Sequence, residues 1–179
     1  CRNTSNFLRC QISNACLTKN GFSIFGYQHN ISTKFPINLG PKTQEKFINV
    51  FNDENSIINY TFSKETAIFS DIQSLPVFFH SMTESIFPIA SVIIDENLIN
   101  ESKVLVLQKS TTTRLDLFNI LNTTVREFKN NSDKFCYKKI IVGVPKYDIK
   151  LNPDLFNEYY RRKFRDTVKF YLFNSNDEI

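Results

Sequence analysis

The sequence has 179 residues, of which 41% are hydrophobic, and it contains 18 Phe, only 4 Gly and no Trp. This length and composition fit one domain or one lobe of a larger protein, and the scarcity of glycine argues against collagen-like, propeller and glycine-rich phosphate-loop architectures. The net charge of +4 is too small and too scattered to indicate a nucleic-acid partner.

No segment of the sequence predicts a membrane span. The longest apolar region, Leu75 to Ile94, is interrupted by charged or titratable residues and two prolines. Because the first residue is Cys1 and not Met, we expect either that an upstream segment was removed or that the sequence is a fragment. A membrane anchor would then lie before Cys1.

The first third of the chain is predicted to be rich in β-strands. Cys10 to Tyr27 favours a β-hairpin, with its turn at Lys19-Asn20-Gly21. Gln28 to Lys42 contains prolines and a glycine and predicts a loop. Lys46 to Phe51 and Ile57 to Phe62 indicate two strands that pair with each other. Thr66 to Phe69 predicts a further strand.

A predicted helix, Leu75 to Pro88, carries the better placed of the two histidines. His80 and Glu84 are four residues apart and would share one helix face, and Pro88 should end or kink the helix. Sites in α/β proteins lie just past the strand ends, where loops lead into helices. The pair is therefore either a site or a buried histidine that hydrogen-bonds its neighbour.

Alternating strands and helices are predicted from there on. We expect a strand at Lys103 to Gln108, a helix at Arg114 to Leu121, a strand at Phe135 to Val144 and a long helix from Asn152 to about Phe173. In the first of these helices, the inward-facing residues are predicted to be Leu117, Ile120 and Leu121. Lys103 to Gln108 is continuously apolar in its centre, as expected for a parallel strand that is buried on both faces. Right-handed crossovers would place these strands in one parallel sheet.

Cysteines and glycosylation sequons both favour the secretory pathway. The four cysteines, Cys1, Cys10, Cys16 and Cys136, permit three complete pairings, and Cys10 and Cys16 are near enough in sequence to close a small loop. Four reduced thiols in a cytosolic protein are the alternative. Against that alternative stand six N-x-S/T sequons, at Asn3, Asn30, Asn59, Asn100, Asn122 and Asn130.

The order of three short motifs resembles the family-61 glycosyltransferases. They are Cys10, Asn14 and Cys16 in a Cys-x-x-x-Asn-x-Cys element; Val77, His80, Glu84 and Pro88 in the helix motif; and Cys136-Tyr137 at the start of a strand that runs into Val142-Gly143. The resemblance extends from Cys10 to about Phe173. Val77 replaces an Asn of the family motif, and Glu84 replaces an Asp.

The resemblance implies an α/β fold, a Rossmann-like N-terminal lobe of GT-B type preceded by β-hairpins. We accordingly predict a β-rich region at residues 1–62 and an acceptor-side Rossmann-like lobe at residues 63–179. The donor lobe of such a protein would follow Ile179. The chain is then one lobe of a larger enzyme or a degenerate homologue, and we expect no activity from it alone.

The activity implied by the resemblance is inverting transfer of a sugar from a nucleotide sugar, with a UDP-sugar expected, to a protein or glycan hydroxyl. His80 is the candidate base or acceptor ligand, and Glu84 would orient it or act as the base itself. Arg114 is a candidate substrate-binding residue. The resemblance implies no tightly bound cofactor. No metal site is predicted, because the cysteine spacing does not fit a zinc site and the sequence contains no Asp-x-Asp pair.

Other features favour less specific roles. The segment Tyr159 to Arg165 indicates a solvated basic helix face more than a phosphate site. The competing class is a secreted or surface glycoprotein that binds without catalysis, in which His80 would be structural. For either class we expect the ER or Golgi lumen or the cell surface.

Overall fold

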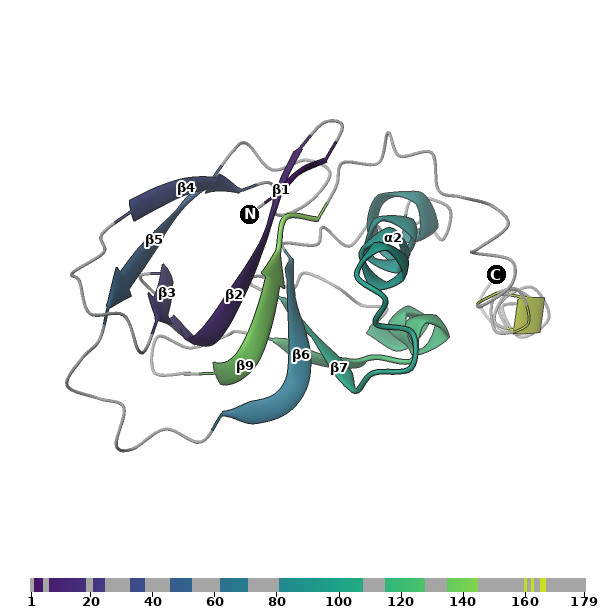
Figure 1. Cartoon of the computed structure of the whole chain (residues 1–179). Helices are drawn as coiled ribbons and strands as arrows, with labels where there is room; N and C mark the ends of the chain where they lie inside the picture. The colour runs from purple at the N-terminus through teal and green to yellow at the C-terminus, as the bar shows by residue number, and fades with distance from the viewer. Residues whose placement is uncertain are drawn as a thin grey trace, which may run out of the picture.

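The structure is a computed structural model. It describes residues 2–4, 7–18, 21–24, 33–37, 46–52, 62–70, 81–107, 115–127, 135–144, 160, 162, 165 and 166, some of them by their backbone alone. Within these residues the protein is a mixed α/β structure in which nine strands form one sheet (Figure 1). The order along the sheet is β4-β5-β3-β2-β9-β6-β7-β8, and β1 pairs with β2 beside this path.

The N-terminal strands include the predicted hairpin. These strands are β1 (Arg2–Thr4), β2 (Phe7–Thr18), β3 (Gly21–Ile24), β4 (Thr33–Ile37) and β5 (Lys46–Asn52). β2 and β3 are antiparallel, and their register ends with Thr18 opposite Gly21. Only two residues then separate the strands, so the hairpin is confirmed.

One prediction in this region was wrong, and another lies mostly outside the described residues. The segment predicted as a loop contains β4, which pairs antiparallel with β5. Pro36 lies within β4, and this is tolerated because β4 is at the edge of the sheet. β5 confirms the strand predicted at Lys46, but it pairs with β4 and, in parallel, with β3. The strand predicted at Ile57 to Phe62, and with it the predicted strand pair, lies outside the described residues except for Phe62.

The second half of the sheet is parallel, as predicted. Its strands are β6 (Ser63–Ser70), β7 (Lys103–Leu107), β8 (Thr124–Glu127) and β9 (Phe135–Val142). β6 pairs in parallel with both β7 and β9, and β7 with β8. β8 was not predicted, because it has only four residues, and its half-buried and exposed positions alternate over too short a stretch to indicate a strand.

The helix before β7 does not end at Pro88. A π-helical segment, η2 (Met82–Ile86), leads directly into α2 (Phe87–Asp95), and Pro88 lies at the start of α2. The Phe87 N–H donates to the Met82 carbonyl in the wide π turn. That turn lets the chain pass through proline, which lacks an N–H and would clash in an ordinary helix interior. Ser74, Pro76 and the other residues at 71–80 lie outside the described residues.

The second predicted helix is a 3₁₀-helix, η3 (Leu115–Leu121). Its predicted inward residues Leu117, Ile120 and Leu121 are all buried, as expected. Residues 160, 162, 165 and 166 of the long predicted helix are helical. Tyr160 packs into the core, and burial raises its pKa to about 12. Arg162 and Arg165 are exposed.

Apolar clusters cover both faces of the sheet. α2 and η3 pack on one face, where their buried residues contact Ile68, Leu105 and Ile141 (Figure 1). On the other face Phe69 and Val104 join Phe22, whose ring meets the ring of Phe69 edge-on at 5.4 Å between centroids. All five residues of β7 are buried, which confirms a strand that is covered on both sides.

One disulfide joins two strands that are far apart in the sequence. Cys16 on β2 lies directly opposite Cys136 on β9, and the two form a disulfide. Cys10 is disulfide-bonded as well. The suggested small loop between Cys10 and Cys16 is therefore not formed: both belong to β2, whose extended backbone carries them away from each other.

One sheet thus includes strands from both predicted regions, 1–62 and 63–179. The antiparallel pair β2–β9 joins the two parts at the centre. The division into two regions stays a prediction. None of the described helices is long and apolar enough to cross a membrane.

Candidate functional site

The parallel strands define one edge at which a ligand site is expected. β7 and β8 follow β6 on one side, whereas β9 lies on its other side. The strand order therefore reverses between β6 and β9, and open α/β sheets bind ligands at the carboxyl ends of the strands at such a point. Here the ends are Ser70, which is buried, and Gly143, which follows β9 with a φ of 97°. That positive φ suits glycine because it has no Cβ.

The predicted catalytic pair belongs to the segment that follows β6. His80 lies outside the described residues, between the end of β6 at Ser70 and the start of η2 at Met82. The backbone of Glu84 lies in η2, and its side chain is outside the described part. Arg114, just before η3, is also outside it. The structure therefore does not test whether these three residues come together.

The π turn that carries Glu84 is itself an unusual feature. π-helical turns are rare and occur often at functional sites. Next to Glu84, the hydroxyl of Ser85 is buried and has no hydrogen-bond partner among the described residues. The turn therefore gives the backbone around Glu84 a geometry that a regular helix would not have.

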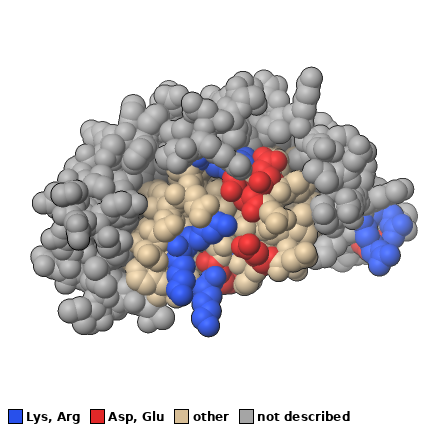
Figure 2. All heavy atoms as spheres, viewed as in Figure 1, with Lys and Arg blue, Asp and Glu red and all other residues tan. Residues whose placement is uncertain are grey.

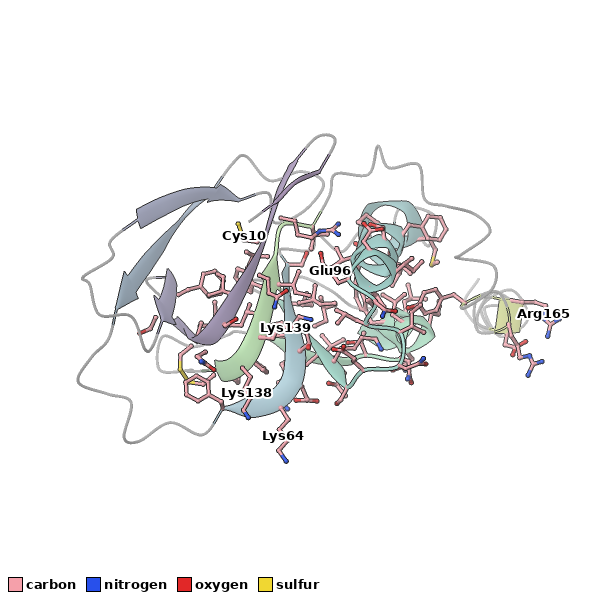
Figure 3. All side chains as sticks on the ribbon, in the orientation of Figure 1. Cys10, Lys64, Glu96, Lys138, Lys139 and Arg165 are labelled. Atoms are coloured by element: carbon pink, nitrogen blue, oxygen red, sulfur yellow. A yellow bond between two sulfur atoms is a disulfide. The ribbon has the colours of Figure 1, made fainter. Side chains whose placement is uncertain are left out.

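A buried arginine that sequence analysis missed holds the same end of the sheet together. Arg9 is 2% exposed, and its Nη1 lies 3.0 Å from Asp95 Oδ2 and 3.3 Å from Glu96 Oε1. Its Nε donates to the carbonyl of Gly143 at 3.4 Å. Figure 3 shows Glu96 between α2 and the upper ends of β2 and β9. Arg9 thus neutralises two carboxylates at the end of α2, where the helix dipole disfavours them, and anchors the residue after β9.

No sequence signal identifies this arginine. Its partners are more than 80 residues away along the chain, since the bond to Asp95 spans 86 positions and the bond to Gly143 spans 134. A buried arginine with several donors engaged is expected to position backbone more than to bind a ligand. Arg9 is therefore a positioning residue at the carboxyl edge.

A second polar feature lies at the opposite, amino edge of the parallel strands. There a hollow of about 400 Å³ is lined by Glu65, Glu101, Ser102, Lys103, Asn119, Asn122, Thr123 and Thr124. Lys103 is buried, and its ammonium group donates to the carbonyls of Ile99 at 3.0 Å and Glu101 at 3.1 Å. The Thr66 hydroxyl donates to Glu101 Oε2 at 3.3 Å. The two Lys103 bonds brace the turn before β7, and the Thr66 bond ties that turn to β6.

Three further side chains link strands close to this hollow. Arg126 Nη2 lies 3.0 Å from Glu65 Oε2, and Arg126 Nη1 donates to the Tyr137 hydroxyl at 3.3 Å. Burial raises the pKa of Tyr137 above its ordinary value, although the neighbouring Arg126 lowers it in part. The phenol therefore stays protonated at neutral pH. Because Arg126 is 43% exposed, the ion pair contributes at most about 1 kcal/mol.

The described residues offer no metal site, and basic and acidic side chains are mixed on the face that Figure 2 shows. They contain no cluster of three or more His, Cys, Asp or Glu side chains that would hold a metal ion. Figure 2 shows basic and acidic atoms next to one another across the described part of one face. That part of the face therefore has no extended basic track for a phosphate backbone.

Comparison with known proteins adds no family. The chain matches no protein-family profile and no curated protein sequence.

Proposed function

We propose that this chain is the acceptor-side, Rossmann-like lobe of a GT-B type glycosyltransferase of the secretory pathway. The proposed reaction is inverting transfer of a sugar from a nucleotide sugar, with a UDP-sugar expected, to a protein or glycan hydroxyl. The observation that carries the proposal is the strand order β8-β7-β6-β9, all parallel, which reverses beside the strand that precedes His80. Such a reversal is where α/β sheets bind their ligands.

The cysteine elements support the same proposal. In the sequence, Cys16 and Cys136 belong to two separate motifs of the resemblance, and in the structure they lie opposite each other and are bonded. Tyr137, which follows Cys136, is buried and contacts Arg126. Disulfides persist in oxidising compartments, which supports an ER or Golgi location.

The proposed chemistry needs a base and a site for the leaving diphosphate. His80 takes the proton of the acceptor hydroxyl as that oxygen attacks the anomeric carbon, and Glu84 orients the imidazole or takes the proton itself. The bond between the anomeric carbon and the diphosphate breaks, and the nucleoside diphosphate leaves. The donor-binding groups belong to the second lobe of such an enzyme, so both lobes are needed for turnover.

The test uses the protein made from the complete reading frame that contains this sequence. Release of UDP is measured over a panel of UDP-sugars with glycoprotein acceptors, for the wild type and for His80→Ala and Glu84→Gln. Because general-base assistance contributes about 10²- to 10⁴-fold, we expect His80→Ala to lower turnover by about that factor. The chain's other histidine supplies the matched control, and we expect His29→Ala to keep turnover within about twofold.

Two outcomes would overturn parts of the proposal. Near-normal turnover in a stably folded His80→Ala protein removes His80 from catalysis. Absence of sugar transfer and of nucleotide-sugar binding in the wild type removes the transferase itself and leaves a secreted binding protein.

A further inference from the structure

Two glycosylation sequons come together at the amino edge of the parallel sheet. Asn100-Glu101-Ser102 leads into β7, and Asn122-Thr123-Thr124 leads into β8. β7 and β8 are neighbours, with Thr124 paired to Val104, and the Thr123 hydroxyl donates to the Lys103 carbonyl at 3.3 Å. The two acceptor asparagines therefore lie just before adjacent strands, at one edge of the sheet.

The asparagines and the hydroxyl residues of both sequons are exposed. Asn100 precedes Glu101, whose N–H donates to the Leu98 carbonyl at 3.1 Å in a tight turn. Asn122 follows η3, and its N–H donates to the Asn119 carbonyl at 3.1 Å. Its φ is 51°, a conformation that Asn adopts more readily than most residues. Ser102 and Thr124, the third residues of the sequons, are exposed as well.

The surface beside these residues leaves room for a sugar. Ser102, Asn122 and Thr124 line the hollow of about 400 Å³, together with exposed carboxylate and amide groups at Glu101 and Asn119. These groups can form hydrogen bonds with a sugar, and no aromatic side chain is among the residues that line the hollow. Weak hydrogen bonding to this polar surface is enough for a covalently attached sugar, because its linkage to the asparagine keeps it at a high local concentration.

We propose that Asn100 and Asn122 both carry N-linked glycans, which make the amino edge of the parallel sheet a glycan-covered face. This inference rests on the secretory location in the proposed function and does not depend on the proposed activity. N-linked glycans are bulky and occupy surface positions. Substrates and any second lobe would then approach the opposite, carboxyl edge, where β6 and β9 end.

The modification is a group transfer by the host cell. The amide nitrogen of each asparagine attacks the anomeric carbon of a lipid-diphosphate-linked oligosaccharide. A carbon–nitrogen bond forms, the bond from that carbon to the diphosphate breaks, and the lipid diphosphate leaves. The amide loses one proton to a base of the host's oligosaccharide transferase.

The experiment maps glycans site by site on protein from the complete reading frame, expressed in eukaryotic secretory cells. Enzymatic release of N-glycans in heavy-oxygen water converts each modified Asn to a labelled Asp, which peptide mass spectrometry detects. We expect labelled Asp at positions 100 and 122. Asn100→Gln, Asn122→Gln and Thr124→Ala should each remove one glycan, seen as one step in gel mobility.

Asn119→Gln is the matched control. Asn119 is exposed in the same hollow, but Leu121 stands where a sequon needs a hydroxyl, so this variant should keep the wild-type mobility. Unlabelled Asn100 or Asn122 in the secreted wild-type protein overturns the proposal, and this readout needs no variant to fold. Glycans at both positions together with no sugar transfer overturn the proposed activity alone.

Discussion

At the scale of single residues, the backbone conformation of Asn14 gives a reason for the asparagine in the Cys-x-x-x-Asn-x-Cys element. Asn14 lies inside β2 with a φ of 47°, whereas the flanking pairs Ser13–Lys139 and Ala15–Tyr137 keep one register. The left-handed region is costly for residues with a Cβ and least so for Gly and Asn. Asn14 therefore sits between two cystine residues of β2 as a local break in an otherwise regular strand.

Replacing Asn14 should reveal this backbone requirement. We expect Asn14→Val to lower the free energy of unfolding by about 1–2 kcal/mol, because a β-branched side chain disfavours positive φ, and Asn14→Gly to stay within about 0.5 kcal/mol of the wild type. Urea unfolding measures both values. Ser13→Val, at the exposed neighbouring position, should cost nothing, since Val favours strands. Equal losses at both positions would contradict this role.

At the scale of elements, proline and β-strand partners were the hardest features to predict. Pro36 lies in β4, in a segment that was predicted to be a loop, and Pro88 lies at the start of α2, where the helix was predicted to end or kink. In both cases the surroundings supply the reason: β4 is an edge strand, and a π turn precedes Pro88. A proline lacks one backbone N–H donor. It prevents a strand or helix only where that donor is needed for a hydrogen bond of the element.

Shortening single side chains of β7 tests whether both faces of this strand are packed against apolar residues. Leu105 packs against the α2 side and Val104 against the opposite cluster. We expect Leu105→Ala to lower the free energy of unfolding by about 2–5 kcal/mol and Val104→Ala by more than about 1 kcal/mol. Urea titration gives both values. Gln11→Ala, at an exposed site on β2, should stay within about 0.5 kcal/mol. A neutral Val104→Ala would mean that the second face is open to solvent.

At the scale of the whole molecule, the β2–β9 pair holds the two parts of the sheet together. Seven residue pairs run from Cys10–Val142 to Leu17–Phe135. Arg9 extends this contact to α2, and the Cys16–Cys136 disulfide closes it at the other end across 120 positions of sequence. Among the described strand pairs, the central one therefore also joins the segments that are farthest apart in the sequence.

Removing this disulfide should lower stability substantially. The double variant Cys16→Ala/Cys136→Ala should lose about 2–5 kcal/mol of unfolding free energy, because the unfolded chain regains the freedom of a long loop. Thermal and urea unfolding without reductant measure the loss. Reductant added to the double variant then reports the remaining bond of Cys10 separately. A loss below about 1 kcal/mol would show that the strand pairing alone holds the two parts together.

What the sequence determined by itself was local. The turn residues at Lys19-Asn20-Gly21 predicted the β2–β3 hairpin. The apolar run at β7 predicted a buried strand, and the pattern at β9 predicted a strand, because turn geometry and side-chain periodicity depend on near neighbours. Helical spacing likewise predicted which side of η3 faces the core.

What only the tertiary structure decided was which distant segments meet. The partner of Cys16, the anchoring of Gly143 by Arg9, the partners of β5 and the meeting of the Asn100 and Asn122 sequons all follow from the order of strands in the sheet. Strand order is set by packing of the whole chain, since any two strands with matching faces satisfy the same backbone hydrogen bonds.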